Sequence, residues 1–198
     1  MRRWIAAALS GLVFGAGMPA SAAERTLYAV VRIGSDVTAD EIVGRRRAGI
    51  ACLPAGRIRW SDVGAGSSTD QREVVQDALE DADLPVVPFG EYGAGHGSDR
   101  VLRLRGVIRA AGFDVCAKHW GMGDAKALSG EAKLDIDWRI ESRAEGGVER
   151  RHLSQVTRTV DARHAAPLAT IHRLLLGDAA RELAAWLKAP AAKAMAAD

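Results

Sequence analysis

Residues 132–141 alternate strictly between apolar and charged side chains, and this is the clearest period in the sequence. One set is Ala132, Leu134, Ile136, Trp138 and Ile140, and the other is Lys133, Asp135, Asp137, Arg139 and Glu141. Successive side chains of a β-strand point to opposite faces, so the pattern predicts a strand with one buried and one solvated face. Such a strand is typical of an antiparallel sheet that is covered on one face only.

A second, polar strand is predicted over residues 148–160, after a hairpin turn at 145–147. Its charge indicates a place near the edge of the sheet, where charged side chains block unwanted pairing. The candidate partner-binding residues of this strand are Arg150, Arg151, His152 and Arg158. They could meet an acidic partner, or they could only protect the edge against aggregation, and the sequence leaves both interpretations open.

Other segments complete an α/β pattern of the α+β type. Further strands are predicted at 27–33, 49–53 and 101–107, with a turn at 54–56 that leads into a short hairpin partner at 57–60. Apolar residues at helical spacing predict helices over 70–82 and 167–187, the first introduced by a capping box from Ser68 to Gln71. The expected fold is a two-layer sandwich in which a mixed, mostly antiparallel sheet is packed by two main helices.

The first 22 residues have the form of a secretory signal peptide. Arg2 and Arg3 precede an uncharged apolar run, and Ala20-Ser21-Ala22 is a small-x-small cleavage site. The apolar run is shorter than the ~20 residues that span a bilayer, and no later run is long enough. We therefore expect a periplasmic or secreted protein with a signal peptide at 1–22, one domain at 23–188 and a frayed tail at 189–198.

Signal cleavage also changes the charge of the chain. The sequence holds 27 Lys and Arg against 25 Asp and Glu, and the signal contains two of the arginines and no acid, so 25 of each remain. A nucleic-acid partner is not expected, because phosphate backbones are bound by a clear positive excess.

The two cysteines, Cys52 and Cys116, are predicted to form a disulfide. Export brings them to an oxidising compartment, and an even pair there is usually bonded. A nucleophilic or metal-binding thiol is the alternative, but the sequence has no CxxC motif and no histidine beside either cysteine.

No catalytic motif stands out, and we predict no catalytic residue, no bound metal and no cofactor. His96 and His119 lie in Gly-rich segments and could meet, and with Asp99 or Asp124 they could hold a metal. That arrangement is the basis of the enzyme alternative. Asp135 and Asp137 share one strand face, where neighbouring Lys133 and Arg139 explain them as a solvated, paired surface.

Three segments carry a resemblance to a known group of proteins. The segments are ACLPAGRIRW (51–60), RVLRLRGVIRAAGFDVC (100–116) and GEAKLDIDWRIESR (130–143). Together they are similar to an exported bacterial accessory domain that occurs alone or ahead of trypsin-like protease domains. More broadly, the order of elements resembles envelope proteins related to curli-secretion lipoproteins, transporter auxiliary lipoproteins and activators of penicillin-binding proteins.

The resemblance implies a fold and an accessory role without an active site. The leading hypothesis is a non-catalytic periplasmic adaptor that binds an envelope protein. The alternatives are a small metal-dependent or hydrolytic enzyme that uses His96 or His119, and a structural envelope component that self-assembles.

Overall fold

The computed structural model describes residues 25–91, 100–117, 127–142 and 148–189. Its centre is the strand pair β4 (Arg100–Ala117) and β5 (Ser129–Ser142), which run antiparallel along most of their length. The alternating segment 132–141 lies within β5, and its apolar members are almost completely buried. The strand predicted from alternation, with one buried face, is therefore confirmed.

β4 is an 18-residue strand that holds the sheet together. On the side away from β5 it pairs in parallel with β1 (Thr26–Ser35) along its first half and with β2 (Ile42–Ala48) along its second half. β3 (Leu53–Arg59) returns antiparallel beside β2, and β6 (Val148–Val160) pairs antiparallel with β5. The strand order is β3-β2-β4-β5-β6, with β1 also beside β4.

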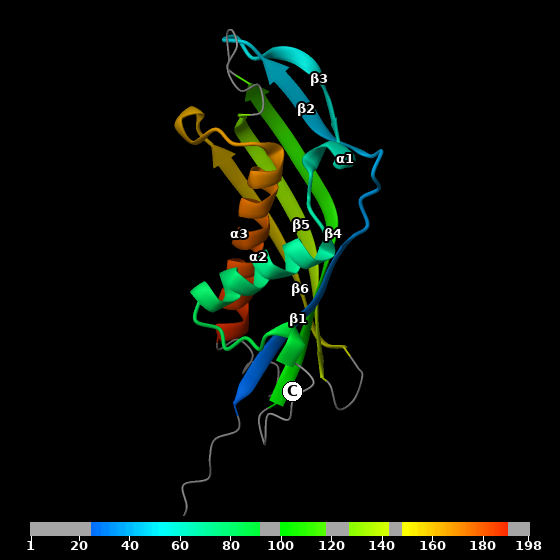
Figure 1. Cartoon of the computed structure of the whole chain (residues 1–198), viewed down its shortest axis with the longest axis vertical. Helices are drawn as coiled ribbons and strands as arrows, with labels where there is room; N and C mark the ends of the chain where they lie inside the picture. Colours follow the sequence, from blue (N-terminus) through cyan, green and yellow to red (C-terminus); the bar gives the residue numbers. More distant parts are fainter. Residues whose placement is uncertain (1–24, 92–99, 118–126, 143–147, 190–198) are drawn as a thin grey trace, which may run out of the picture.

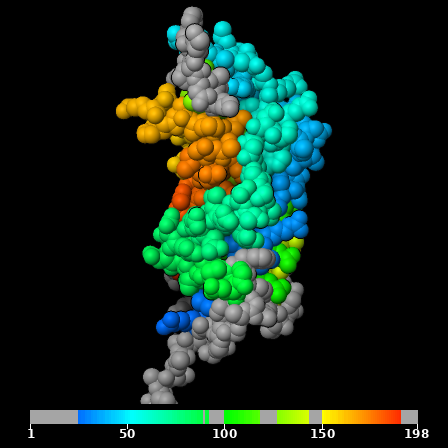
Figure 2. All heavy atoms as spheres, in the orientation of Figure 1, coloured from blue at the N-terminus to red at the C-terminus, as the bar shows by residue number. Residues whose placement is uncertain are grey.

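Two long helices cover one face of this sheet. Figure 1 shows α2 (Ser68–Asp81) and α3 (Leu168–Lys188) on the same side, with α3 over β5 and β6. In the space-filling view the two helices adjoin and form one surface (Figure 2). Three single-turn helices lie between the longer elements, at α1 (Trp60–Val63), η1 (Phe89–Glu91) and η2 (Ala162–His164). The predicted two-layer α+β sandwich with a mixed, mostly antiparallel sheet and two main helices is confirmed.

Trp138 is the centre of the buried layer between the sheet and α3. Its ring has no exposed surface, and its Nε1 donates a hydrogen bond of 3.0 Å to Ser154 Oγ on β6. Ser154 Oγ in turn donates to the backbone oxygen of Ala179 on α3, at 3.3 Å. A buried polar group without a partner is costly, so this chain satisfies the indole inside an apolar layer and ties both elements to it.

The first long helix begins one residue earlier than the capping motif predicts. The reciprocal cap joins Ser67 and Asp70, because Ser67 Oγ accepts from Asp70 N and Asp70 Oδ2 accepts from Ser67 N at 2.7 Å. The predicted box from Ser68 to Gln71 is wrong by one position. An acidic N3 residue supplies the same acceptor as Glu or Gln and also favours the positive end of the helix dipole.

The predicted buried strand at 49–53 is also wrong. Residues 49–52 form the turn between β2 and β3, and Gly49 and Cys52 there have left-handed backbone angles. Leu53 is the first residue of β3, and the side chains of Ile50 and Leu53 are exposed. The strand instead lies at 42–48, in the segment whose three arginines indicated a solvated surface. The predicted turn at 54–56 lies within β3, and residues 57–59 do pair with β2 in the expected hairpin.

Candidate functional site

Strand β6 forms one edge of the sheet and carries the four predicted partner-binding residues. From Arg150 onward its even-numbered residues face α3, and its odd-numbered residues point to the opposite face, which we call the open face. Arg150, His152 and Arg158 therefore face the helix, and Arg151 alone of the four lies on the open face. The structure divides the predicted set between the two faces.

The three residues that face the helix are held by side chains of α3. The guanidinium carbon of Arg150 lies 4.0 Å from the centre of the Trp186 ring, and the imidazole of His152 stacks on the same ring at 4.7 Å. Arg158 Nη1 donates a hydrogen bond of 2.5 Å to Asp178 Oδ2. Arg150, His152 and Arg158 thus stabilise the packing of α3 against the sheet. Neither interpretation of the sequence includes this role.

Arg151 belongs to a row of four arginines that crosses the open face. Arg32 of β1 is in register with Arg105 of β4, Arg105 with Arg139 of β5, and Arg139 with Arg151 of β6. Directly paired residues of neighbouring strands project from the same face. Like charges at such positions destabilise a sheet, so this row stands out as an arrangement with an electrostatic cost.

Carboxylates offset only part of this charge. Glu141 Oε2 lies 3.3 Å from Arg105 Nε, and Asp137 Oδ2 lies 3.9 Å from the nearest Arg139 nitrogen. Within the part of the chain that the structure describes, Arg32 and Arg151 have no carboxylate within ion-pair distance, and Arg139 Nε is buried without a hydrogen-bond partner.

The closest ion-pair partner of Asp137 is Arg109, and not Lys133 or Arg139, the neighbours that the sequence suggests as its partners. Arg109 on β4 donates to Asp137 Oδ2 at 2.7 Å and also pairs with Asp36, which follows β1. Both hydrogen bonds raise the pKa of Arg109 above its ordinary value, with the bond to Asp137 the larger cause. Lys133 pairs with Glu131 at 3.1 Å. The solvated, paired surface predicted for Asp137 is thus built across strands.

Three arginines of the row line one hollow in the open face. The hollow has a volume of about 220 Å³ and is lined by Arg32, Arg105 and Arg139 together with Glu141, Ser35 and Gly34 among others. Gly34 lies on the open face, and a Cβ there would meet no atom closer than Arg32 Nε at 3.9 Å. The absence of a side chain at Gly34 therefore leaves space beside the Arg32 guanidinium.

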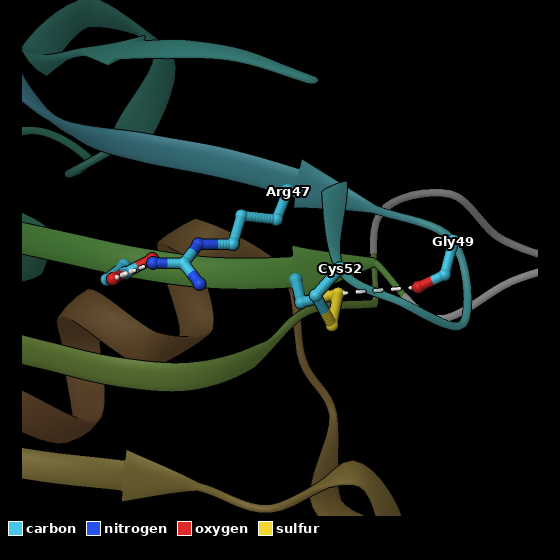
Figure 3. Close-up of a disulfide and its surroundings, with 5 residues drawn as sticks. Arg47, Gly49 and Cys52 are labelled. Carbon is cyan, nitrogen blue, oxygen red and sulfur yellow. Dashed lines mark hydrogen bonds and ion pairs between the residues drawn. A yellow bond between two sulfur atoms is a disulfide. The ribbon is translucent and has the colours of Figure 1, made fainter. Parts of the chain in front are cut away.

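The disulfide lies at the far end of the sheet from this hollow. Cys52 and Cys116 are bonded as predicted, which ties the β2–β3 turn to the end of β4. In Figure 3 the bond lies beside Gly49, whose carbonyl oxygen is 3.7 Å from Cys116 Sγ. Close by, Arg47 Nη2 donates a hydrogen bond of 2.7 Å to Asp114 Oδ2. These contacts fix the turn, and they assign the two cysteines to a structural role.

His172 is the buried histidine of the described chain. It is 2% exposed, its ring meets the edge of Trp60 at 5.4 Å, and its Nε2 has no hydrogen-bond partner in the described ranges. Burial lowers its pKa from 6.5 to about 4, so the ring is neutral at pH 7. The sequence singled out His96 and His119 instead, and both lie outside the described residues, as does most of the Gly-rich loop. Among the described residues, no group of three or more His, Cys, Asp or Glu could hold a metal ion.

No family model matches the chain, and no curated protein is similar to it. Solved structures do resemble it. A Xanthomonas campestris protein of family DUF330 is 17% identical, with a TM-score of 0.44 and 83% of each chain covered. A minor lipoprotein of Acinetobacter baumannii is 10% identical, with a TM-score of 0.36 and 72% of this chain and 91% of that chain covered.

A third similar structure is the PelC dodecamer of Paraburkholderia phytofirmans. It is 12% identical, with a TM-score of 0.36 and 81% of this chain and 86% of that chain covered. Similarity at this level carries no information about activity. The resemblance to protease-linked and curli-secretion proteins stays a prediction. Over the described residues, no helix is long and apolar enough to cross a membrane.

Proposed function

We propose that the chain is a non-catalytic accessory domain of the cell envelope, and that it binds an extended segment of an envelope protein along strand β6. The observation that carries the proposal is the outer edge of β6. This 13-residue strand pairs with β5 on one side, and no described strand pairs with it on the other. An edge of this length offers a row of backbone donors and acceptors to an added strand.

The opposite edge of the sheet is much less suited to strand addition. β3 has seven residues, contains Pro54, and pairs with β2 through two register shifts. Proline and bulges are the devices by which natural sheets block edge pairing. In β6 the sequence has no proline, and the one register shift lies at its first residues. The two edges thus differ in the features that decide whether a segment can add.

The side chains of β6 on the open face suggest the chemistry of the partner. Arg151 has no ion-pair partner among the described residues, and Leu153 beside it is 51% exposed. The residues that follow on this face are Gln155, Thr157 and Thr159, all exposed and uncharged. We expect a segment with a carboxylate opposite Arg151 and an apolar residue next to Leu153. Strand addition supplies the affinity through the backbone, and these two side chains set the register.

Residues 1–22 and the disulfide support an envelope location. The signal-peptide pattern predicts export, and a disulfide is stable in the oxidising compartments to which exported proteins are delivered. An adaptor in that setting needs an accessible edge and no active site.

A site-specific cross-linking experiment tests the proposal. A photo-reactive residue is placed at Leu153 on β6 or at Arg57 on β3, and the mature protein is irradiated in envelope extract. We expect one protein to be captured from position 153 and not from position 57. Equal capture from both edges would contradict the proposal.

The captured protein then allows a matched comparison. Arg151→Glu should weaken its binding at least about tenfold, since the substitution replaces an attraction with a repulsion at the added strand. Arg57→Glu makes the same change in net charge on β3 and should leave binding unaltered. Binding should also slow hydrogen exchange in β6 but not in β3, because strand addition buries backbone amides.

A further inference from the structure

We infer that the hollow between Arg32, Arg105 and Arg139 is a binding site for a phosphoryl group. This site lies on the open face, and Arg151 does not line it. The inference is therefore independent of the partner segment proposed at β6.

The geometry brings guanidinium groups from three strands to one place. Neighbouring strands lie about 4.8 Å apart, so the backbones of β1 and β5 are about 10 Å apart on either side of β4. Arg32 and Arg139 nevertheless line the same hollow, and Arg105 lies in register between them. Two arginine side chains can close on one group across such a distance.

The charges of the hollow favour an anion. Glu141 is paired with Arg105, and Asp36 at the rim is paired with Arg109. Arg32 has no carboxylate partner among the described residues, and Arg139 has an orphaned Nε and a carboxylate no closer than 3.9 Å. Because Arg139 Nε is itself buried, the exposed parts of the Arg32 and Arg139 guanidinium groups are what a ligand would meet. A bound anion would also reduce the repulsion among Arg32, Arg105 and Arg139.

A phosphoryl group matches these donors better than a single carboxylate. The planar guanidinium fork binds two oxygens of a phosphate or carboxylate at once. A phosphate monoester carries up to two negative charges and three acceptor oxygens, so it can accept hydrogen bonds from two arginines together. The open space beside Gly34 gives that group room next to Arg32.

Thermal unfolding and calorimetry of the mature protein test this site with inorganic phosphate. We expect phosphate to raise the melting temperature relative to chloride at the same ionic strength. Arg32→Gln and Arg139→Gln should each weaken phosphate binding at least about tenfold. Gly34→Leu should abolish binding, because the leucine side chain would fill the hollow. The fold should tolerate this substitution, since Gly34 has no left-handed backbone angle and the nearest described atom to its Cβ would be 3.9 Å away. Arg57→Gln on β3 is the matched control and should bind like the wild type.

Vesicles distinguish the two sources of a phosphoryl group. Phosphatidylcholine vesicles with and without phosphatidate are sedimented with the wild type and with Arg139→Gln. Binding that needs both phosphatidate and Arg139 identifies a lipid headgroup, and binding of free phosphate alone identifies a soluble phosphate compound. The inference is overturned if neither probe binds, or if Arg57→Gln weakens binding as much as Arg139→Gln does.

Discussion

Gly106 on β4 lies directly opposite Trp138 on β5, and a Cβ at Gly106 would lie 2.8 Å from Cζ3 of the indole. The same Cβ would lie 3.0 Å from Cδ1 of Ile33 on β1. The indole thus occupies the space that a side chain at 106 would take, and the largest buried side chain of the core depends on the smallest residue of the neighbouring strand.

Gly106→Ala should destabilise the protein by about 1–3 kcal/mol, because the added methyl group overpacks the Trp138 site. Gly112→Ala is the control in the same strand. Among the described residues, the nearest atom to its Cβ would be Lys133 Cβ at 3.8 Å, so the free energy of unfolding should stay unchanged or rise slightly. Urea titrations of both variants check the difference. Equal effects at the two positions would show that the space opposite Trp138 is not limiting.

Trp138→Ala should cost about 3–5 kcal/mol, because it empties the centre of the core. Ser154→Ala should cost about 1–3 kcal/mol, because it leaves the buried indole N–H without an acceptor. Asp137→Ala lies on the open face and should cost about 1 kcal/mol or less, since its pair with Arg109 is partly solvated. Denaturant unfolding ranks the three variants. A loss for Asp137→Ala as large as that for Trp138→Ala would mean that the face assignment is wrong.

Alternation in the sequence predicted β5 and its buried face because a period of two has one structural meaning over ten residues. The apolar run at 49–53 indicates a strand only weakly, because a run this short has no period, and its residues 49–52 form a turn. The turn depends on the left-handed backbone conformation of Cys52 and on a disulfide to Cys116, which is 64 positions away. The charged run at 45–47 indicates a solvated surface and not a strand. It forms part of β2 because it pairs with β3 on one side and with β4 on the other, and the local sequence does not specify this pairing.

The arginine row could be predicted only in part. Each member lies in a segment that alternates or reads as a strand, so the sequence does place Arg105, Arg139 and Arg151 on strands. Their alignment depends on the register of three strand pairs, and a shift of one residue would put each arginine on the other face. The division of Arg150, Arg151, His152 and Arg158 between two faces was already implicit in their odd and even numbers.

Replacing both cysteines with alanine should lower stability by about 2–4 kcal/mol, since the disulfide closes a loop of 64 residues. The β2–β3 turn should then lose its protection against hydrogen exchange before β5 does, because the bond ties that turn to β4. Unfolding of the wild type and the double variant, with exchange read by mass spectrometry, measures both effects. Two free thiols in protein purified from the periplasm would contradict the assignment of the bond.

Stability should fall as the pH is lowered from about 6.5 to about 4, because of His172. The pKa of His172 is about 4 in the folded protein and 6.5 in the unfolded chain. Between these two pH values the unfolded chain binds a proton at this histidine and the folded protein does not. The full loss is about 3 kcal/mol at 1.36 kcal/mol per pH unit. Asp70, which lines the same pocket as His172, titrates below this pH window, because the backbone hydrogen bond from Ser67 lowers its pKa below the ordinary 3.8.

The variant His172→Gln separates this effect from other titrations. A neutral side chain of similar size cannot take up the proton, so the slope of unfolding free energy between about pH 6.5 and about pH 4.5 should become flatter. Urea titrations at both pH values measure the slope. An unchanged slope would assign the acid sensitivity to groups other than His172.

Arg139→Gln should leave stability unchanged or raise it by up to about 1 kcal/mol at low salt, although it removes a long side chain from the sheet. Arg139 is in register with Arg105 on one side and Arg151 on the other, and like charges in such pairs destabilise a sheet. Its distant contact with Asp137 at 3.9 Å offsets little of that repulsion. The gain should shrink as salt is added, because screening weakens the repulsion that the variant relieves.

Lys133→Gln, on the same face of β5 but paired with Glu131, is the control and should show no gain. A salt-independent loss of stability in Arg139→Gln would mean that the arginine stabilises the sheet by packing, and that the row carries no electrostatic strain for an anion to relieve.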